Sequence, residues 1–391
     1  MRAREDPPAP GREPPRREVF ELSSAEFSSA CEALLDRLGE PPYRAAQIRD
    51  WVYRRTPERF EDMTDLPRGL RRELEARWVL HPLEEAGAEL SADGTRKFLW
   101  LRSGAGSVET VAIPDRGRVT FCVSTQEGCP VRCSFCATGR GGYRGQLRAS
   151  EIVDQVLQMR RIASEPTNIV YMGMGEPLLN YRAVRTSLEV LTSPGAVGFG
   201  ARRITVSTVG VPERIRDLAR DFPQVKLAVS LHAPADEIRS RIVPLNDKHP
   251  LSEVLDAVRF HVRTSGKQAT FEYVILPGVN DGEAEAKALA RLLRGIPSRI
   301  NLIGFNPFPG APYEKPAVQR VLKFRDWLNR EFPGAVTVRR SRGEDIRGAC
   351  GQLSAHARKQ SEPRGERGPG AGGGKERGLL REGLVEGGNW G

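Results

Sequence analysis

The sequence contains no apolar run near the length of a membrane span, although hydrophobic residues make up 39% of its 391 positions. It has only six cysteines, and its first residues lack the apolar core of a signal peptide. These absences argue against a membrane protein and against a secreted domain held together by disulfides. We therefore expect a cytoplasmic protein that uses its cysteines for catalysis or metal binding.

Acidic residues are less frequent than basic ones. The sequence has 50 aspartates and glutamates and 60 lysines and arginines, which gives a formal net charge of +10. A basic balance of this kind favours a polyanionic partner over an acidic or neutral one. Charge alone does not identify that partner, because many basic proteins bind nothing anionic.

Composition and periodicity divide the chain into five parts. Residues 1–19 are rich in Pro and Arg and residues 356–391 in Gly and Arg. Both stretches have too few apolar residues to offset chain entropy, so we predict disorder at both ends. Residues 20–85 carry apolar side chains at helical spacing, which predicts a small helical accessory domain. Residues 86–118 alternate as strands do and predict a β-hairpin extension, and residues 119–355 form the main domain.

The main domain alternates between predicted strands and predicted helices. Such βα units imply a parallel sheet with right-handed crossovers. The predicted strands are 119–124, 168–172, 203–207, 226–231, 270–276, 300–305 and 335–340. Six or seven strands are fewer than the eight that close a full barrel. The predicted fold is therefore α/β, a partial (βα)₆ TIM-like barrel with an open side that could admit a large substrate.

The most informative motif is the set of three cysteines Cys129, Cys133 and Cys136, spaced as C-x₃-C-x₂-C. A structural zinc site takes four protein ligands in a closed tetrahedron. Three thiolates on one tight loop suit a 4Fe–4S cluster instead, with one thiolate on each of three irons. The fourth iron then stays open to a ligand from solution, so the cluster would be a reaction centre. Three structural cysteines in a turn are the plainer alternative.

Further polar and glycine-rich motifs follow several of the other predicted strands. In a parallel barrel these connections gather at the C-terminal face, where active sites form. Besides the cysteine loop, they are residues 173–177, 207–208, 230–232, 306–310 and Cys350. The convergence of six motifs on one rim is stronger evidence for an active site than any single motif.

These motifs resemble those of the radical S-adenosylmethionine (SAM) enzymes and, among them, of the dual-specificity 23S rRNA/tRNA adenine-C2 methyltransferases. The resemblance covers roughly residues 20–355. Its most specific stretches are 129–136, 171–177, 230–234, 306–313 and 349–353. The cysteine spacing specifies only the superfamily, whereas the accompanying Cys122 and Cys350 specify the subfamily.

The resemblance implies radical chemistry at carbon 2 of adenine, which is too electron-poor to take a methyl group from SAM by polar displacement. One SAM would methylate the sulfur of Cys350, and a radical generated from a second SAM would remove a hydrogen from that S-methyl group. The resulting carbon radical would add to the base, and Glu109 would take the C2 proton. Cys122 would then attack the Cys350 sulfur, which forms a disulfide and releases the methylated adenine.

The resemblance also implies the cofactor contacts and the partners. Cys129, Cys133 and Cys136 would hold the cluster. Residues that would bind SAM are Gly175 and Glu176 at its methionine part, and Ser207, Ser230, Leu231, His232 and Asn306 along the rest. The partners would be 23S rRNA and tRNA, with residues 20–85 binding RNA, and an electron donor such as flavodoxin or ferredoxin. We expect a monomer.

Each of these roles has a plainer alternative. Cys122 lies within an apolar strand and could be a core thiol, and Cys350 could be an incidental surface thiol. Glu109 could be an ordinary exposed carboxylate, and His232 could be a hydrogen-bonded core histidine. Glu176, which precedes a proline, could merely close a turn.

Three other functions stay open at this point. The nearest is the related enzyme that methylates C8 of the same rRNA adenine and confers antibiotic resistance. A second is an iron–sulfur protein that binds RNA without catalysis. A third is a radical SAM enzyme that acts on a protein or a small molecule.

Overall fold

The computed structural model of the chain describes residues 16–104 and 106–354. The disorder predicted for residues 1–15 and 356–391 concerns residues outside these ranges. The prediction that residues 1–19 are disordered is wrong for residues 17–19. Arg17–Glu18 forms strand β1, which pairs in parallel with Trp78–Val79 (β2), and Val19 is fully buried. The folded part therefore begins before residue 20, because these residues pack into the core.

The first folded part is a small helical unit. Helix α1 (Ser24–Leu38) begins at a capping box: the Ser23 hydroxyl accepts from the Glu26 N–H at 3.2 Å, and the Glu26 carboxylate accepts from the Ser23 N–H at 2.8 Å. Cys31 on this helix is 0% exposed, so it is the core thiol that the spacing predicts. The other elements are α2 (Arg44–Asp50), a π-helical turn (Trp51–Arg55) and α3 (Arg68–Arg77).

A ten-stranded sheet forms the centre of the main part, in the order β14-β13-β12-β11-β10-β9-β6-β5-β4-β3. The seven strands from β6 to β14 run parallel, and β3, β4 and β5 are antiparallel. The strands are β3 (Leu83–Leu90), β4 (Arg96–Arg102), β5 (Ser107–Asp115), β6 (Arg118–Cys122), β9 (Asn168–Tyr171), β10 (Ile204–Thr208), β11 (Lys226–Ser230), β12 (Ala269–Ile275), β13 (Ser298–Gly304) and β14 (Val336–Arg339). Two further strands, β7 (Gln126–Gly128) and β8 (Tyr143–Gln146), pair with each other beside the cysteine loop.

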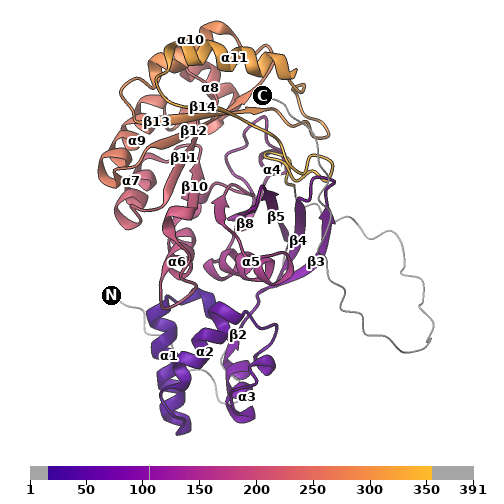
Figure 1. Cartoon of the computed structure of the whole chain (residues 1–391), viewed down its shortest axis with the longest axis vertical. Coiled ribbons are helices and arrows are strands. Elements are labelled where there is room, and N and C mark those ends of the chain that lie inside the picture. Colours follow the sequence, from indigo (N-terminus) through magenta and orange to yellow (C-terminus); the bar gives the residue numbers. More distant parts are fainter. Residues whose placement is uncertain (1–15, 105, 355–391) are drawn as a thin grey trace, which may run out of the picture. The chain divides into compact units, whose positions relative to one another are not determined.

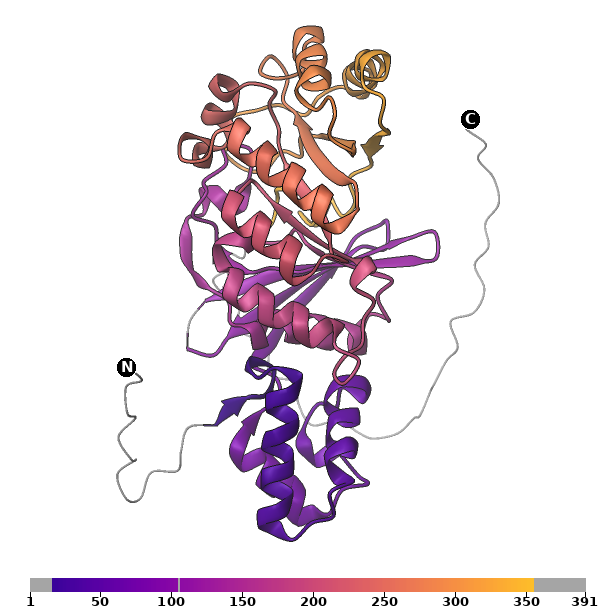
Figure 2. The ribbon, with the colours of Figure 1, turned by 90° about the vertical axis from the view of Figure 1, so that its left-hand side faces the viewer.

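Helices connect the parallel strands and cover their outer face (Figures 1 and 2). They are α5 (Ala149–Ile162), α6 (Tyr181–Thr192), α7 (Pro212–Asp221), α8 (Asp236–Ile242), α9 (Leu251–Ser265), α10 (Glu283–Leu292) and α11 (Val318–Glu331), with a short α4 (Ala137–Arg140) after the cysteines. Short 3₁₀ segments are Val19–Glu21, Phe60–Asp62, Pro177–Asn180, Ala201–Arg203 and Pro244–Asp247. The main part thus has six strand–helix units followed by one last strand. This confirms the predicted partial (βα)₆ barrel. No helix among the described residues is both long and apolar enough to cross a membrane.

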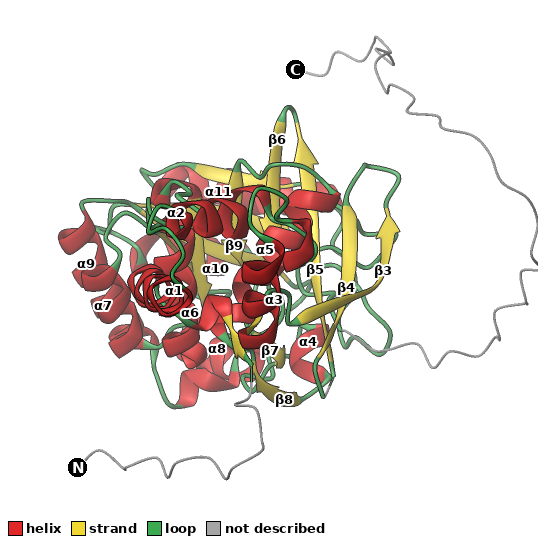
Figure 3. Ribbon diagram, turned by 90° about the horizontal axis from the view of Figure 1, so that it is seen from below, coloured by secondary structure: helices red, strands yellow, loops and turns green. Residues whose placement is uncertain are grey.

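The antiparallel strands extend the barrel sheet. β5 pairs with β6 through Val111 and Cys122, so β3, β4 and β5 continue the sheet on the side away from α7 and α9 (Figure 3). The predicted hairpin at 86–118 is thus a three-stranded ribbon that begins at Leu83.

The two edge strands, β14 and β3, do not pair with each other. The chain that follows β14 crosses to the antiparallel strands instead, and we call residues 341–354 the closing segment. Asp345 accepts from the Ser91 hydroxyl at 2.6 Å and from the Ala92 N–H at 3.1 Å. Gly343 donates its N–H to Asp93 at 3.0 Å. An irregular segment, and not an eighth strand, therefore links the end of β14 to the antiparallel strands.

A buried ion pair fastens the helical unit to α5. His81 lies 2.6 Å from Asp154 through Nδ1 and 2.8 Å from the Pro57 carbonyl oxygen through Nε2. Both partners are acceptors, so only the doubly protonated imidazolium satisfies both contacts. Burial lowers the pKa of His81, but the Asp154 carboxylate outweighs it and the net pKa is raised. Asp154 is 0% exposed and also accepts from the Leu83 N–H at 3.1 Å.

Replacement of Asp154 by Asn should lower the free energy of unfolding by about 3–5 kcal/mol, because it leaves a buried cation without its partner. The raised pKa sets the pH dependence. The stabilisation by the pair is complete below the unfolded-state pKa of about 6.5 and is lost as pH rises through the higher folded-state value. Denaturant unfolding from pH 6 to pH 9 should therefore show the difference between wild type and D154N shrink. A difference that does not vary with pH would contradict the charged pair.

Candidate active site

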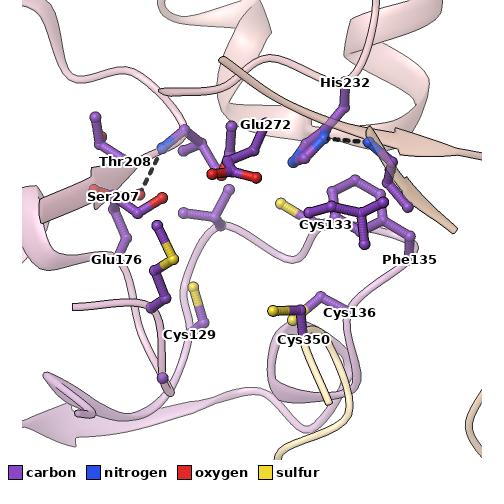
Figure 4. A pocket seen from close by; sticks show the side chains of 18 of the residues that line it. Cys129, Cys133, Phe135, Cys136, Glu176, Ser207, Thr208, His232, Glu272 and Cys350 are labelled. Atoms are coloured by element: carbon purple, nitrogen blue, oxygen red, sulfur yellow. Dashed lines mark hydrogen bonds between the residues drawn. The ribbon is translucent and has the colours of Figure 1, made fainter. Parts of the chain in front are cut away.

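The C-terminal ends of the parallel strands surround a pocket that is open to solvent (Figure 4). Ten of the thirteen predicted site residues line it. They are Cys129, Cys133, Cys136, Gly175, Glu176, Ser207, Ser230, His232, Asn306 and Cys350. The predicted convergence of strand-end motifs on one rim is therefore observed.

The three clustered cysteines lie on a tight loop between β7 and α4. Arg132 has a φ of +58°, which turns the chain between the first two cysteines. The Cys136 N–H donates to the Cys133 carbonyl at 3.2 Å, and Cys136 caps the N-terminus of α4. The three side chains face the pocket from one wall (Figure 4).

This donor set fits an iron–sulfur cluster. Burial raises the pKa of Cys129 to about 12, so this thiol becomes a thiolate only with a strong electrophile such as iron beside it. Within the described ranges, no three Cys, His, Asp or Glu side chains are arranged to hold one metal ion. A cube that takes one thiolate per iron has ligands that stand further apart than those of a single ion.

Glu176 stands where β9 leads into the next helix, and it is 3% exposed. Its carboxylate accepts from the Leu178 N–H at 3.0 Å and from the Val209 N–H at 2.9 Å. Burial raises its pKa to about 6, against these hydrogen bonds. At neutral pH the group is mostly ionised, so a positively charged ammonium is a suitable ligand for it.

His232 follows β11 in the left-handed region, with a φ of +62°. Its Nδ1 accepts from the Val274 N–H at 3.0 Å, and its ring meets the Phe135 ring edge-on at 4.6 Å. Burial lowers the pKa of His232 to about 3, so the ring is neutral. Because Nδ1 is an acceptor, the proton lies on Nε2 and can be donated to a ligand.

The other predicted SAM contacts differ in their placement. Ser207 and Ser230 end neighbouring strands and line the pocket. Leu231 is 0% exposed and does not line it. Its carbonyl oxygen accepts from the Arg239 guanidinium at 2.9 Å, and its N–H donates to the Glu272 carbonyl at 3.0 Å. The backbone N–H and carbonyl of Leu231 thus each make a hydrogen bond within the protein, and its contact with SAM stays a prediction.

The closing segment holds Cys350 beside Cys136 (Figure 4). The Ala137 N–H donates to the Gly351 carbonyl at 2.7 Å, and the Thr138 hydroxyl donates to the Leu353 carbonyl at 2.6 Å. Asn306 donates its side-chain amide to the Cys350 carbonyl at 3.1 Å. Asn306 therefore positions the Cys350 backbone in addition to lining the pocket.

Cys122 lies outside the first pocket, in a second one that it shares with Cys350. Cys136, Asn306, Arg339 and Cys350 line both pockets, so the two are neighbours. Burial raises the pKa of Cys122 to about 12, and Arg339 acts in the opposite direction.

Glu109 lines neither of these two pockets. It is 8% exposed on β5, and its carboxylate contacts the Lys97 ammonium at 3.2 Å. Its second oxygen accepts from the Ser354 N–H at 2.8 Å. The predicted base is therefore close to the closing segment, although it lines neither of the two pockets that contain Cys350.

Two buried charged residues near the pocket, Arg239 and Glu272, are not among the predicted site residues. Arg239 on α8 is 1% exposed and donates to Leu231, to the Val209 carbonyl and to Asn246 at 2.8 Å. Nothing in the sequence distinguishes it from the exposed Arg241 on the same helix. Glu272 on β12 lines the pocket, and a charge in the middle of an otherwise apolar strand was the signal that could have revealed it.

The family follows from comparison with known proteins. The Radical SAM superfamily model matches residues 123–290, and the model of the ribosomal RNA large subunit methyltransferase N-terminal domain matches residues 27–80. The dual-specificity RNA methyltransferase RlmN of Anaeromyxobacter sp. (strain Fw109-5) is 42% identical over 364 residues, which are 91% of this chain and 94% of that protein. The chain belongs to the RlmN family.

Other RlmN relatives agree. The protein of the same name from Anaeromyxobacter dehalogenans (strain 2CP-C) is 46% identical over 332 residues, 83% of this chain and 89% of its own length. A radical SAM methyltransferase from Sphaerobacter thermophilus has the same fold, with a TM-score of 0.82 and 45% identity over 87% of this chain and 100% of that chain. As an RlmN family member the chain is a radical SAM enzyme, and its cofactors are a 4Fe–4S cluster and SAM.

Gly175 should not tolerate a side chain in this RlmN family pocket. Its φ is +102°, and an added Cβ would lie 2.6 Å from the Gln126 Cβ. Gly175→Ala should destabilise the protein by about 1–3 kcal/mol and weaken SAM binding at least tenfold, because the wall beside Glu176 must shift. Gly200→Ala is the control, since an added Cβ there meets nothing closer than 3.8 Å and φ is negative. Equal SAM affinities, measured by calorimetry, would contradict the steric argument.

Proposed function

We propose that this chain transfers a methyl group to carbon 2 of adenine in RNA, in both 23S rRNA and tRNA, with Cys350 as the methyl carrier. The observation that carries the proposal is the position of Cys350, which lines both the cluster-cysteine pocket and the pocket of Cys122. A thiol in that position can take a methyl group on one side and surrender it on the other. The RNA specificity is that of the RlmN relatives named above.

The cluster and SAM, when bound, supply the radical chemistry that an unreactive aromatic carbon requires. Cys129, Cys133 and Cys136 hold the cluster. The Glu176 carboxylate pairs with the SAM ammonium, and the Nε2–H of His232 donates to the ligand. Gly175, Ser207, Ser230 and Asn306 complete the SAM pocket as lining residues.

The two remaining residues act on protons and on sulfur. Cys122 attacks the Cys350 sulfur, for which it must become a thiolate, and the Arg339 guanidinium favours that form. Glu109 takes the C2 proton once the closing segment withdraws the Ser354 N–H from its carboxylate. We further propose flavodoxin or ferredoxin as the electron donor, a monomeric state and a cytoplasmic location.

The helical unit carries a surface that suits an RNA backbone. Five arginines and two glutamates line a shallow hollow there, a surplus of three positive charges; they are Arg16, Arg59, Arg68, Arg71, Arg72, Glu61 and Glu75. Arg68 and Arg72 are exposed in the first turns of α3, with no ion pair among the described residues. Arginines at a helix N-terminus bind phosphates well. This supports RNA binding by residues 20–85.

Cys350→Ala should abolish RNA methylation while the cluster still assembles, because the carrier thiol is lost and the three cluster ligands stay. Anaerobic reconstitution with iron, sulfide and SAM, followed by mass analysis of the RNA, measures this. Wild type should give 2-methyladenine and a methylated Cys350. Cys31→Ala, the control, removes a core thiol and should keep the product. A C8 methyl group would favour the resistance enzyme, and an unmethylated Cys350 in active protein would overturn the carrier role.

The double variant Arg68→Ala, Arg72→Ala should weaken RNA binding and flatten its salt dependence, because two phosphate contacts are lost. The slope of log K against log salt should fall by up to about 2. Fluorescence anisotropy with tRNA at several salt concentrations gives the slope. Arg214→Ala, Arg259→Ala removes the same charge from α7 and α9 and is the control. An equal change in both double variants would mean that the hollow has no particular role.

A further inference from the structure

Glu272 has a carboxylate oxygen that the protein itself does not satisfy. The residue is 4% exposed, and its side chain points into the pocket from β12 (Figure 4). Oε1 accepts from the Asn301 amide at 2.9 Å, whereas Oε2 has no hydrogen-bond partner among the described residues. A buried acceptor left unpaired destabilises the protein, so such a group in a pocket indicates a ligand that donates to it.

Arg339 is the charged neighbour of this oxygen. Its Nη1 lies 3.9 Å from Oε2, which is too long for a hydrogen bond. Arg339 stands at the end of β14 and lines both pockets, together with Cys350, whereas Glu272 lines only the first and Cys122 only the second. The Glu272 carboxylate, an acceptor, and the Arg339 guanidinium, a donor, therefore stand side by side in the pocket wall. Arg339 is the one of the two that lines both pockets together with Cys350.

A ligand edge with one donor and one acceptor side by side would satisfy both groups. Adenine has such an edge: the 6-amino group donates, and N1 next to it accepts. C2, the carbon to be methylated, is the next ring atom after N1. The order amino group, N1, C2 along the base matches the order Glu272, Arg339, Cys350 in the pocket wall.

We propose that Glu272 and Arg339 recognise the target adenine, with the carboxylate accepting from its 6-amino group and the guanidinium donating to N1. This inference rests on the proposed function. It assigns base discrimination to two residues that the SAM and cluster contacts do not use. Guanine and inosine carry an N1–H and a 6-oxygen, so each would place a donor against Arg339 and an acceptor against Glu272.

The same contact also favours the reaction. A hydrogen bond from Arg339 to N1 draws electron density from the ring, and C2 is adjacent to N1. An electron-poor C2 accepts a carbon radical more readily, so recognition and activation would come from one guanidinium.

The test compares RNA stem-loops that carry adenosine, purine riboside or inosine at the target position. Purine riboside keeps N1 but lacks the 6-amino group. Equilibrium affinity by fluorescence anisotropy and single-turnover methyl transfer are both measured for each RNA. Wild type should prefer adenosine to purine riboside by about tenfold, the value of one hydrogen bond to a buried carboxylate. Glu272→Ala should lose that preference, and Glu272→Gln, which keeps an acceptor, should retain most of it.

Arg339→Met should lower the rate with adenosine and weaken the rejection of inosine. Its control is Arg299→Met, which removes the same charge from an exposed position on β13 and should leave both ratios as in wild type. Equal handling of adenosine and purine riboside by wild type would overturn the proposal. A Glu272→Ala variant that loses SAM affinity but keeps the adenosine preference would assign Glu272 to SAM and overturn it too. The absence of methyl transfer to any RNA, with base-dependent affinities retained, would instead count against the proposed function alone.

Discussion

The site depends on the hydrogen bonds that hold the closing segment against the cysteine loop. The Ala137 N–H and the Thr138 hydroxyl donate to the carbonyls of Gly351 and Leu353, and the Thr138 bond spans 215 positions. The Asn306 amide also holds the Cys350 carbonyl. Cys350 is exposed, and these contacts fix the position of its backbone. With them it lies between the cluster cysteines and Cys122. The proposed role of Cys350 as methyl carrier rests on that position, because the carrier sulfur has to meet two different reaction partners.

The rest of the pocket has fixed polar groups whose partners are mainly backbone atoms. Glu176 is held by two N–H groups, and His232 by the Val274 N–H. Arg239 in turn holds the carbonyls at the end of β11. Groups that are oriented before the ligand arrives lose little entropy on binding it. The strand ends therefore supply both the shape of the pocket and its electrostatic character.

Much of the fold could be predicted from the sequence, because strand–helix alternation and the strand-end motifs are local patterns. All seven parallel strands lie where apolar runs indicated them, and ten of thirteen site residues meet in one pocket. The failures have long-range causes. Arg239 is buried because carbonyls that follow two neighbouring strands, β10 and β11, accept from it, which no local pattern shows. Glu109 contacts Ser354, which is 245 positions further along the chain, and no local pattern indicates that contact.

The closing segment has a mechanical consequence. A barrel closed by an eighth strand could open its wall only by breaking a continuous ladder of backbone hydrogen bonds. Here the seam consists of a few contacts through the side chains of Asp93, Glu109, Asp115 and Asp345. None of these contacts belongs to the ladder of the ten-stranded sheet. Cys350 belongs to the segment that they hold, so their strength determines how firmly the thiol is kept beside Cys136.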